Sequence, residues 1–507
     1  MSRTVAQDTS LTLLPSNTIP LNDSPCSELI APRPLVIVEG FLGFPKRELW
    51  GDFEEHCHAG SSSKFRRRVI FAAISPVASL HDRACELYYF LRGGTVDYGE
   101  EHACEHHHSR FGRTYPEAAY PEWSTAKPLH FLGHSLYVLP HRGTQSVYLL
   151  GQSRVGKSDF KRFSFGWMMS KTVHIATYLQ PVLPFQFDLY TETRPLSCHE
   201  TSFGHLMKRL WRSDWTEGKD VGPYDTTFES ANLRESRMEG ELNPNSYYRS
   251  YSASMTRRKR NDGGAGFHKP SRKHMLHMPH LYFLSSSMGD FDFSTIRPMP
   301  SFLARMDGGV PNDVVERLEL SSDHWTEDSH PHEAFYANDG MVPVFSQWHP
   351  FECRRTSCRH YGSSRCSPES SSSSDISSSP ASTEDREYSQ GEIEPGTWHV
   401  YHMEDAHHHS IVPMWTGSDR QKTFWRDLGR WLAEVDSASL TRPVLDANPP
   451  PDVIDETEVV QVDVSGAPLE SLAISVNKST RNVKAKHDHR RLGSITKSIV
   501  LKRLVGF

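Results

Sequence analysis

The chain has 507 residues, of which 37% are hydrophobic, and its mean hydropathy is −0.56. This length is enough for one large domain or two smaller ones, but the low apolar content predicts disordered segments beside a folded core. The net charge of −6 excludes a general attraction to nucleic acid or anionic lipid. Because no apolar run reaches 18 residues, we expect no transmembrane segment.

The N-terminal residues 1–32 are polar and mixed, and we expect them to be disordered. They contain no continuous apolar segment of the kind that a signal peptide needs. The eight cysteines lack the regular spacing of a disulfide framework, which favours a reducing compartment. We therefore expect a cytoplasmic protein, or a secreted one if the start of the chain is misassigned.

Two apolar, β-branched stretches, 34–39 and 69–74, are typical of buried strands, and a helical pattern follows at 82–91. Strands that alternate with helices predict an α/β fold with a mostly parallel sheet covered on both faces. The first strand leads into the glycine-containing loop 40–44. There the backbone can approach a ligand closely, or the loop can be an ordinary turn.

The stretch 82–116 places several imidazoles and a carboxylate in loop-forming sequence. Imidazole nitrogens and carboxylate oxygens suit Zn²⁺ in tetrahedral geometry, although a solvated histidine-rich loop has the same composition. A helical pair, His102 and His106, is a further alternative.

Four motifs in this stretch carry a resemblance to a known family. They are DRACELY at 82–88, GGTVDYG at 93–99, a pair of histidines separated by five residues, and RFGRTYP at 110–116. In this order and spacing they resemble the zinc-containing thermostable bacterial lipases and their fungal relatives. The resemblance extends in patches over the stretches 33–355 and 395–436.

This family has the α/β-hydrolase fold, so the resemblance implies a mostly parallel central sheet and hydrolysis of triacylglycerols or related carboxylic esters. It also implies a zinc-bearing insertion and a helical lid-like insertion. The zinc ligands would be Asp82, His102, His108 and a later aspartate, which is best matched by Asp188. Since two Asp and two His fill all four positions, this zinc would be structural.

The apolar run 129–132 ends on Gly-His-Ser, which resembles a strand that delivers Ser135 to the nucleophile elbow of a hydrolase. The motif G-x-S-x-G is only half present, because no glycine follows Ser135 at the usual place. The resemblance assigns the two backbone N–H groups of the oxyanion hole to Phe41 and Leu136. Only four residues separate Ser135 from the family's P-x-x-G-T segment at Pro140, so we expect the elbow helix and one strand to be deleted.

The sequence Asn338-Asp339-Gly340 resembles the family's N-D-G-x-V, whose aspartate orients the catalytic histidine. The alternative is a surface turn, because such a sequence forms turns readily. With Ser135 before it and a histidine after it, Asp339 fits the chain order of hydrolase triads.

The catalytic histidine is expected in the loop after a final strand at 396–401, where three consecutive histidines occupy 407–409. The family's spacing to 410–412 favours His408 over His407 and His409. The bacterial relatives have a calcium-binding glutamate at the position of Ser410, so no calcium site is expected.

Three further stretches carry expectations. The pattern at 199–215 predicts an amphipathic helix, either a mobile lid that contacts a lipid surface transiently or a helix docked on the core. The run 280–284 predicts a late strand. Four side chains, Cys353, Cys358, His360 and Cys366, offer ligands for a second metal, but their spacing fits no familiar zinc motif.

The expected organisation divides the chain after the N-terminal segment into four parts. They are a first hydrolase part at 33–357, a Ser-rich disordered insertion at 358–394, a last strand and helix at 395–437, and a disordered tail at 438–507.

The leading hypothesis is a lipase-like ester hydrolase that uses Ser135, His408 and Asp339 and forms an acyl-enzyme. The alternative is a catalytically inactive, zinc-stabilised protein of the same fold, because the elbow is truncated after Ser135. A third alternative gives the zinc a direct part in hydrolysis.

Overall fold

A computed structural model describes residues 31–441, apart from 44–46, 62, 136–140, 156, 184–187, 259–267, 302–332, 362–392 and 413–417. These residues fall within a single unit, Pro32–Phe507, except for Ala31. The expected disordered segments at the two ends, and most of the Ser-rich segment, lie outside the described residues.

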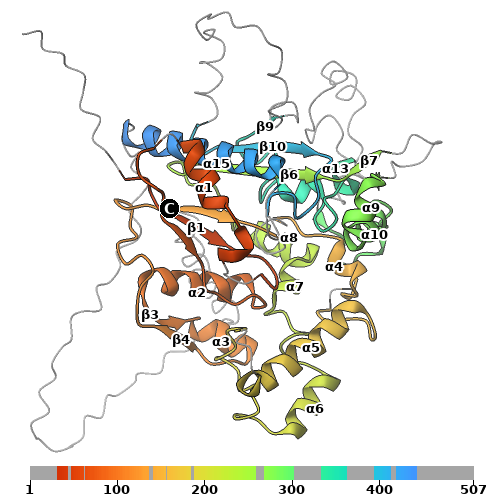
Figure 1. The fold of residues 1–507 in the computed structure, drawn as a ribbon. Coiled ribbons are helices and arrows are strands. Elements are labelled where there is room, and N and C mark those ends of the chain that lie inside the picture. Colours follow the sequence, from red (N-terminus) through yellow and green to blue (C-terminus); the bar gives the residue numbers. More distant parts are fainter. Residues whose placement is uncertain are drawn as a thin grey trace, which may run out of the picture. The chain divides into compact units, whose positions relative to one another are not determined.

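The first sheet is parallel and has the strand order β2-β1-β5. Its strands are β1 (Leu35–Val38), β2 (Val69–Phe71) and β5 (His130–Gly133). Because side chains alternate along β1, Leu35 and Ile37 pack on one face while Val36 packs on the other. Helices cover both faces, as the continuous apolar run predicted. They are α1 (Phe53–Ser61) and α15 (Asp419–Thr441) on the side of Leu35, and α2 (Leu80–Arg92) on the side of Val36 (Figure 1).

Helices α1 and α15 pack with their backbones in close approach. A Cβ atom on Gly60 would lie 1.9 Å from the carbonyl oxygen of Arg426, and one on Gly429 would lie 1.8 Å from that of Cys57. Only glycine fits at either position, since no side chain atom can come so close to backbone. Helix α15, the last described helix, is therefore packed directly against α1.

The second sheet is also parallel and has the order β6-β10-β9. Its strands are β6 (Tyr248–Ser254), β10 (Trp398–Glu404) and β9 (Cys358–Tyr361). Among the described residues, β5 and β6 belong to different sheets.

The edge of β6 that faces away from β10 bonds to a loop segment in place of a strand. The carboxamide of Gln347 accepts from the backbone N–H of Ala253 at 2.7 Å and donates to its carbonyl at 3.0 Å. Met255 N donates to the carbonyl of Asn338 at 2.9 Å. Gln347 lies in the short 3₁₀ helix η4 (Val344–Gln347) and is fully buried. The Gln347 side chain therefore supplies hydrogen-bond partners for the N–H and C=O groups of Ala253, which no described strand pairs on this edge.

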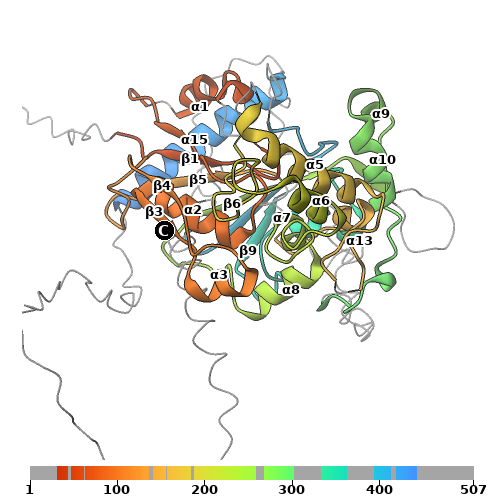
Figure 2. The ribbon, with the colours of Figure 1, turned by 90° about the horizontal axis from the view of Figure 1, so that it is seen from below.

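The remaining elements lie around these sheets (Figures 1 and 2). The hairpins are β3 (Gly94–Asp97) with β4 (Phe111–Tyr115), and β7 (Thr256–Arg258) with β8 (His268–Pro270). The helices before β6 are η1 (Arg47–Trp50), α3 (Glu100–His106), α4 (Ser146–Leu149), α5 (Phe165–Leu179), η2 (Gln180–Val182), α6 (Phe203–Trp211), α7 (Gly222–Asp225) and α8 (Phe228–Ser236). Those after it are α9 (Lys273–His277), α10 (Pro279–Met288), η3 (Phe293–Thr295) and α13 (Glu333–Tyr336).

Three expectations on secondary structure need correction. The run 280–284 is part of helix α10, where Leu281, Ser285 and Met288 form a buried helical face behind Pro279 at the first turn. Residues 358–361, which were expected to be disordered, form strand β9 because their backbone pairs with β10. Helix α15 continues to residue 441 rather than ending at 437.

No helix in the described part of the chain combines the length and the apolar character that crossing a membrane requires.

Candidate functional site

Ser135 lies just beyond the end of β5, in a strained backbone conformation. Its φ angle is +73°, which a side-chain-bearing residue adopts only where its surroundings hold it. Gly40, just beyond the end of β1, packs against it so closely that a Cβ atom there would lie 2.4 Å from Ser135 Cβ. Because β1 and β5 are parallel neighbours, both residues lie at the same edge of the sheet.

The carboxylate of Asp339 is held by the turn that contains it. Its Oδ1 accepts the backbone N–H groups of Met341 at 2.8 Å and Val342 at 2.7 Å. The side chain of Asn338 accepts from Gly340 N at 3.0 Å, and Gly340 has a φ of +101°. The turn is buried, with Asp339 only 1% exposed, so the alternative of a surface turn does not hold.

His408 links Ser135 to Asp339. Its Nδ1 donates to Asp339 Oδ2 at 2.9 Å, and its Nε2 lies 2.9 Å from Ser135 Oγ. Since Nδ1 carries the proton, Nε2 presents the lone pair that accepts the proton of the Ser135 hydroxyl. The backbone N–H of His408 also donates to the carbonyl of Asp339 at 2.9 Å. Of the three consecutive histidines, the middle one therefore makes both contacts that a general base needs.

His134 supports the loop that carries this imidazole. Its Nε2 donates to the carbonyl of His408 at 3.1 Å. Burial lowers the pKa of His134 to about 3, with the nearby His408 adding to the effect, so the ring stays neutral and keeps one donor nitrogen.

The residues expected in the oxyanion hole are only partly described. Phe41 directly follows Gly40, and so lies beside the Ser135 loop. The next amide, Leu42 N, is already used by the carbonyl of Pro76 at 3.0 Å. Leu136 lies outside the described residues.

Two groups of side chains in the described part of the chain could hold a metal ion. The first is Asp82, His102, His108 and Asp220, whose ligand atoms lie within 4.8 Å of one another. His102 Nε2 is 3.0 Å from Asp82 Oδ1 and 3.2 Å from Asp220 Oδ1, and His108 Nε2 is 3.4 Å from Asp220 Oδ2. Tetrahedral zinc with bonds of about 2.0–2.1 Å separates nitrogen and oxygen ligands by roughly 3.4 Å. The spacing fits such an ion.

The chemistry of this group also suits a cation. His108 Nδ1 donates to the carbonyl of Ser109 at 2.8 Å, so its Nε2 presents a lone pair toward a carboxylate and makes no hydrogen bond. Hydrogen bonds to Asp220 and Asp82 outweigh burial and raise the pKa of His102 to about 9. Both effects reflect two buried carboxylates that attract positive charge.

Asp188, expected as the fourth ligand, lies elsewhere. Its carboxylate forms an ion pair with Arg113 at 2.7 Å and accepts the backbone N–H of Tyr190. Asp220 takes the expected place because it is 4% exposed and is oriented by Arg194, which donates to its Oδ2 at 2.8 Å. His106, the alternative partner of His102 on α3, lies with its ring centroid 4.6 Å from that of His102 but is not a member of the group.

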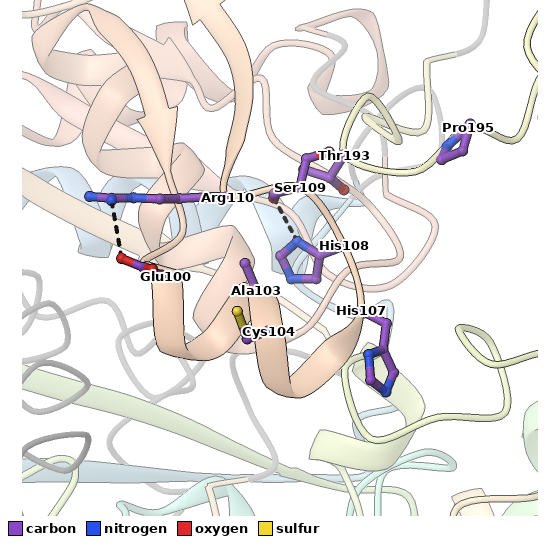
Figure 3. Close-up of a pocket in the computed structure, with 9 residues that line it drawn as sticks. All are labelled: Glu100, Ala103, Cys104, His107, His108, Ser109, Arg110, Thr193 and Pro195. Atoms are coloured by element: carbon purple, nitrogen blue, oxygen red, sulfur yellow. Dashed lines mark hydrogen bonds and ion pairs between the residues drawn. The ribbon is translucent and has the colours of Figure 1, made fainter.

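A surface hollow of about 560 Å³ lies beside this group (Figure 3). Its lining includes Glu100, Cys104, His108 and Arg110, and none of Ser135, Asp339 and His408. The hollow therefore borders the first candidate metal group rather than the Ser135 site.

The second group is His349, Cys353, Cys358 and His360. The sequence indicated three of these, with Cys366 as the fourth, but Cys366 lies outside the described residues. His349 and Asp220 both escaped sequence reasoning because neither lies in a motif that the resemblance covers. The role of His134 was missed as well, although it stands next to Ser135.

Helices α5 and α6 lie side by side and expose large apolar side chains (Figures 1 and 2). On α6, Leu206 is buried, while Phe203 and Trp211 are 63% and 74% exposed. On α5, Phe165 and Met168 are similarly exposed.

The fold and the hydrogen-bonded series define the class of protein: an α/β protein in which a serine after β5, a histidine after β10 and an aspartate in a buried turn are linked by hydrogen bonds. Comparison with known proteins extends this. Residues 32–157 match the family described as Lipase-like, C-terminal domain. The lipase of Staphylococcus hyicus is 27% identical over 374 residues, which cover 61% of this chain and 54% of that protein. Lipase 1 of Staphylococcus aureus strain MRSA252 is 26% identical over 360 residues, 63% of this chain and 46% of its own.

The crystal structure of the Staphylococcus hyicus lipase matches with a TM-score of 0.53 at 20% identity, covering 81% of this chain and 97% of that chain. This likeness shows a shared fold. The sequence matches span about half the length of the staphylococcal lipases. The chain is thus a relative of the bacterial lipases, which confirms the resemblance that its motifs indicated.

Proposed function

We propose that this protein is a lipase-like carboxylic ester hydrolase that acts through Ser135, His408 and Asp339. The observation that carries the proposal is the series of two 2.9 Å contacts from Ser135 Oγ through His408 to Asp339, together with the strained φ of Ser135. The relatives, which are lipases, support an acyl ester as the substrate.

In the proposed mechanism, Ser135 Oγ attacks the ester carbonyl while His408 Nε2 takes its proton. Asp339 stabilises the imidazolium that forms. His408 then passes the proton to the leaving alcohol, and an acyl group remains on Ser135. Water hydrolyses this acyl-enzyme with His408 again as the base. We assign oxyanion stabilisation to the amides of Phe41 and Leu136.

We propose that α5 and α6 carry the lid-like surface. Their exposed aromatic side chains suit the edge of a lipid aggregate, where apolar rings leave water. Because the chain has no net positive charge, such contact would depend on apolar burial more than on anionic headgroups.

For Asp82, His102, His108 and Asp220 we propose a structural zinc. Four protein ligands complete a tetrahedral shell and leave no position for water, so this metal would stabilise the fold around α2 and α3 rather than activate a nucleophile. Chelation is accordingly expected to lower the melting temperature and leave low-temperature turnover intact.

The separate pairing of β5 and β6 supports the proposed loss of a strand and of the elbow helix. An inactive protein remains the competing proposal, because a misplaced Leu136 amide alone would cost about 10²–10³ in rate. The contacts of Ser135 favour an active enzyme, since the nucleophile and base are already in hydrogen-bonding range.

The test uses the full chain with a short-chain p-nitrophenyl ester and a fluorophosphonate probe. We expect turnover and labelling of Ser135, both lost in Ser135→Ala by at least about 10³-fold. Ser287→Ala, an exposed serine on α10, is the matched control and should retain both. Labelling without turnover would indicate an activated nucleophile with a defective oxyanion hole. The absence of both labelling and turnover would support the inactive alternative.

A further inference from the structure

The second group of metal-ligating side chains lies at the outer strand of the second sheet. His349 follows η4, Cys353 lies in the next turn, and Cys358 and His360 belong to β9. Their two thiol sulfurs and two imidazole nitrogens lie within 4.8 Å of one another. No residue of the Ser135 site or of the Asp82 group belongs to it.

The spacings agree with a single tetrahedral ion at the centre. Cys353 Sγ lies 3.5 Å from His349 Nε2 and 3.5 Å from His360 Nε2. Zinc bonds of about 2.3 Å to sulfur and about 2.0–2.1 Å to nitrogen place tetrahedral S and N ligands roughly 3.6 Å apart. The side-chain ligand atoms of His349, Cys353 and His360, which lie in different segments of the chain, are thus separated by the distance expected between two ligands of one zinc ion.

The His360 imidazole is also held in the orientation that ligation needs. His360 Nδ1 is hydrogen-bonded to His402 Nε2 of β10 at 2.9 Å, so its Nε2 points toward Cys353. The ring of Trp348 packs edge-on against His360 with centroids 4.8 Å apart. His349 is fully buried. Such outer contacts fix the tautomer and angle of metal-binding histidines.

We propose that His349, Cys353, Cys358 and His360 form a Cys₂His₂ site for a structural zinc ion. Two thiolates and two imidazoles in tetrahedral arrangement select zinc, and with four protein ligands the ion has no open position for water. The ion would link β9, the outer strand of the second sheet, to the segment after η4 and so stabilise that strand. This inference goes beyond ester hydrolysis and does not depend on it.

The first test measures zinc in the full-length protein purified without chelator. Titration of the thiols with p-hydroxymercuribenzoate, with released zinc read by a colorimetric indicator, should liberate one zinc per chain. The carboxylate–imidazole group has no thiol ligand, so its zinc should stay bound. The absence of thiol-dependent release, or a disulfide between Cys353 and Cys358 in the intact mass, would overturn the proposal.

A second test compares Cys353→Ser/Cys358→Ser with the control Cys198→Ser, a cysteine outside the group. We expect the double variant to hold one zinc per chain fewer than the control by elemental analysis, and equal content would contradict the site. If the double variant does not fold, cobalt-grown wild-type protein replaces it. Its spectrum should show thiolate-to-cobalt charge transfer that the mercurial abolishes, and a spectrum without that band would refute thiolate ligation.

Discussion

The proposed nucleophile, Ser135, and the carboxylate proposed to orient its base, Asp339, are held in different ways. The first sheet holds Ser135 by close approach of neighbouring backbone, with Gly40 packed on a residue of positive φ. Asp339 is held by a shell of buried hydrogen bonds that its own turn supplies. The orientation of the carboxylate is therefore set locally, whereas the place of the hydroxyl depends on strand packing. Destabilisation of the first sheet should therefore displace Ser135 before it disturbs the contact between His408 and Asp339.

The sheets also differ in the ligands gathered beside them. The group near α2 and α3 combines carboxylates with imidazoles, and the group at β9 combines thiols with imidazoles. Reagents that attack thiols should therefore separate the two, while a general chelator should not.

The largest effect is expected from a change to Asp339, the residue proposed to orient His408. Asp339→Asn should reduce kcat by about 10⁴-fold, because an amide favours the tautomer of His408 that lacks a lone pair toward Ser135. The melting temperature should change far less than the rate. Steady-state ester hydrolysis and a thermal melt measure the two quantities, with the exposed Asp159→Asn as a control. A rate within tenfold of wild type would show that Asp339 does not orient the base.

The next effect concerns the fold around α2 and α3. Asp220→Ala should destabilise the protein by about 3–5 kcal/mol, since it leaves the side chain of Arg194 and the remaining ligands buried without their carboxylate. Asp188→Ala, at a half-exposed ion pair with Arg113, should cost no more than about 1 kcal/mol. Urea unfolding of both variants provides the comparison. If Asp188→Ala were the more damaging of the two, the assignment of Asp220 would fail.

A smaller effect is expected at the edge of the second sheet. Gln347→Leu removes both hydrogen bonds to Ala253 and leaves its buried N–H and C=O groups unsatisfied, at a cost of about 1–3 kcal/mol each. Because η4 follows the Asp339 turn, kcat should fall together with stability. Measurement of both at a temperature well below the melting point separates direct displacement of Asp339 from unfolding. Unchanged stability would show that water or another group replaces the carboxamide.

Much of the site could be predicted from sequence because long motifs carry it. Ser135, Asp339 and His408 came from short family-like motifs, their spacing and their order, and three members of the first metal group came from the stretch 82–116 that carries the resemblance. Asp220 could not be found in that way, since only the folded chain brings it to His102 and Arg194. His349 was missed because it lies in no motif of the resemblance, and only the folded chain brings it to Cys353.

The local sequence pattern predicted the wrong secondary structure in two segments where longer-range context determines it. The apolar run 280–284 has strand composition, yet Pro279 starts a helix whose buried face continues to Met288. Strand β9 precedes a Ser-rich segment and has little apolar character of its own, so its pairing with β10 could not be foreseen.

The glycine-mediated contact between α1 and α15 has a consequence for biosynthesis. Leu35 and Ile37 emerge from the ribosome early, but Trp425 and Leu428, which cover them, are made nearly 400 residues later. During most of translation this side of the first sheet lacks its C-terminal cover, and α1 lacks the partner that its glycine admits. A nascent chain of this kind needs protection from self-association until α15 has been synthesised.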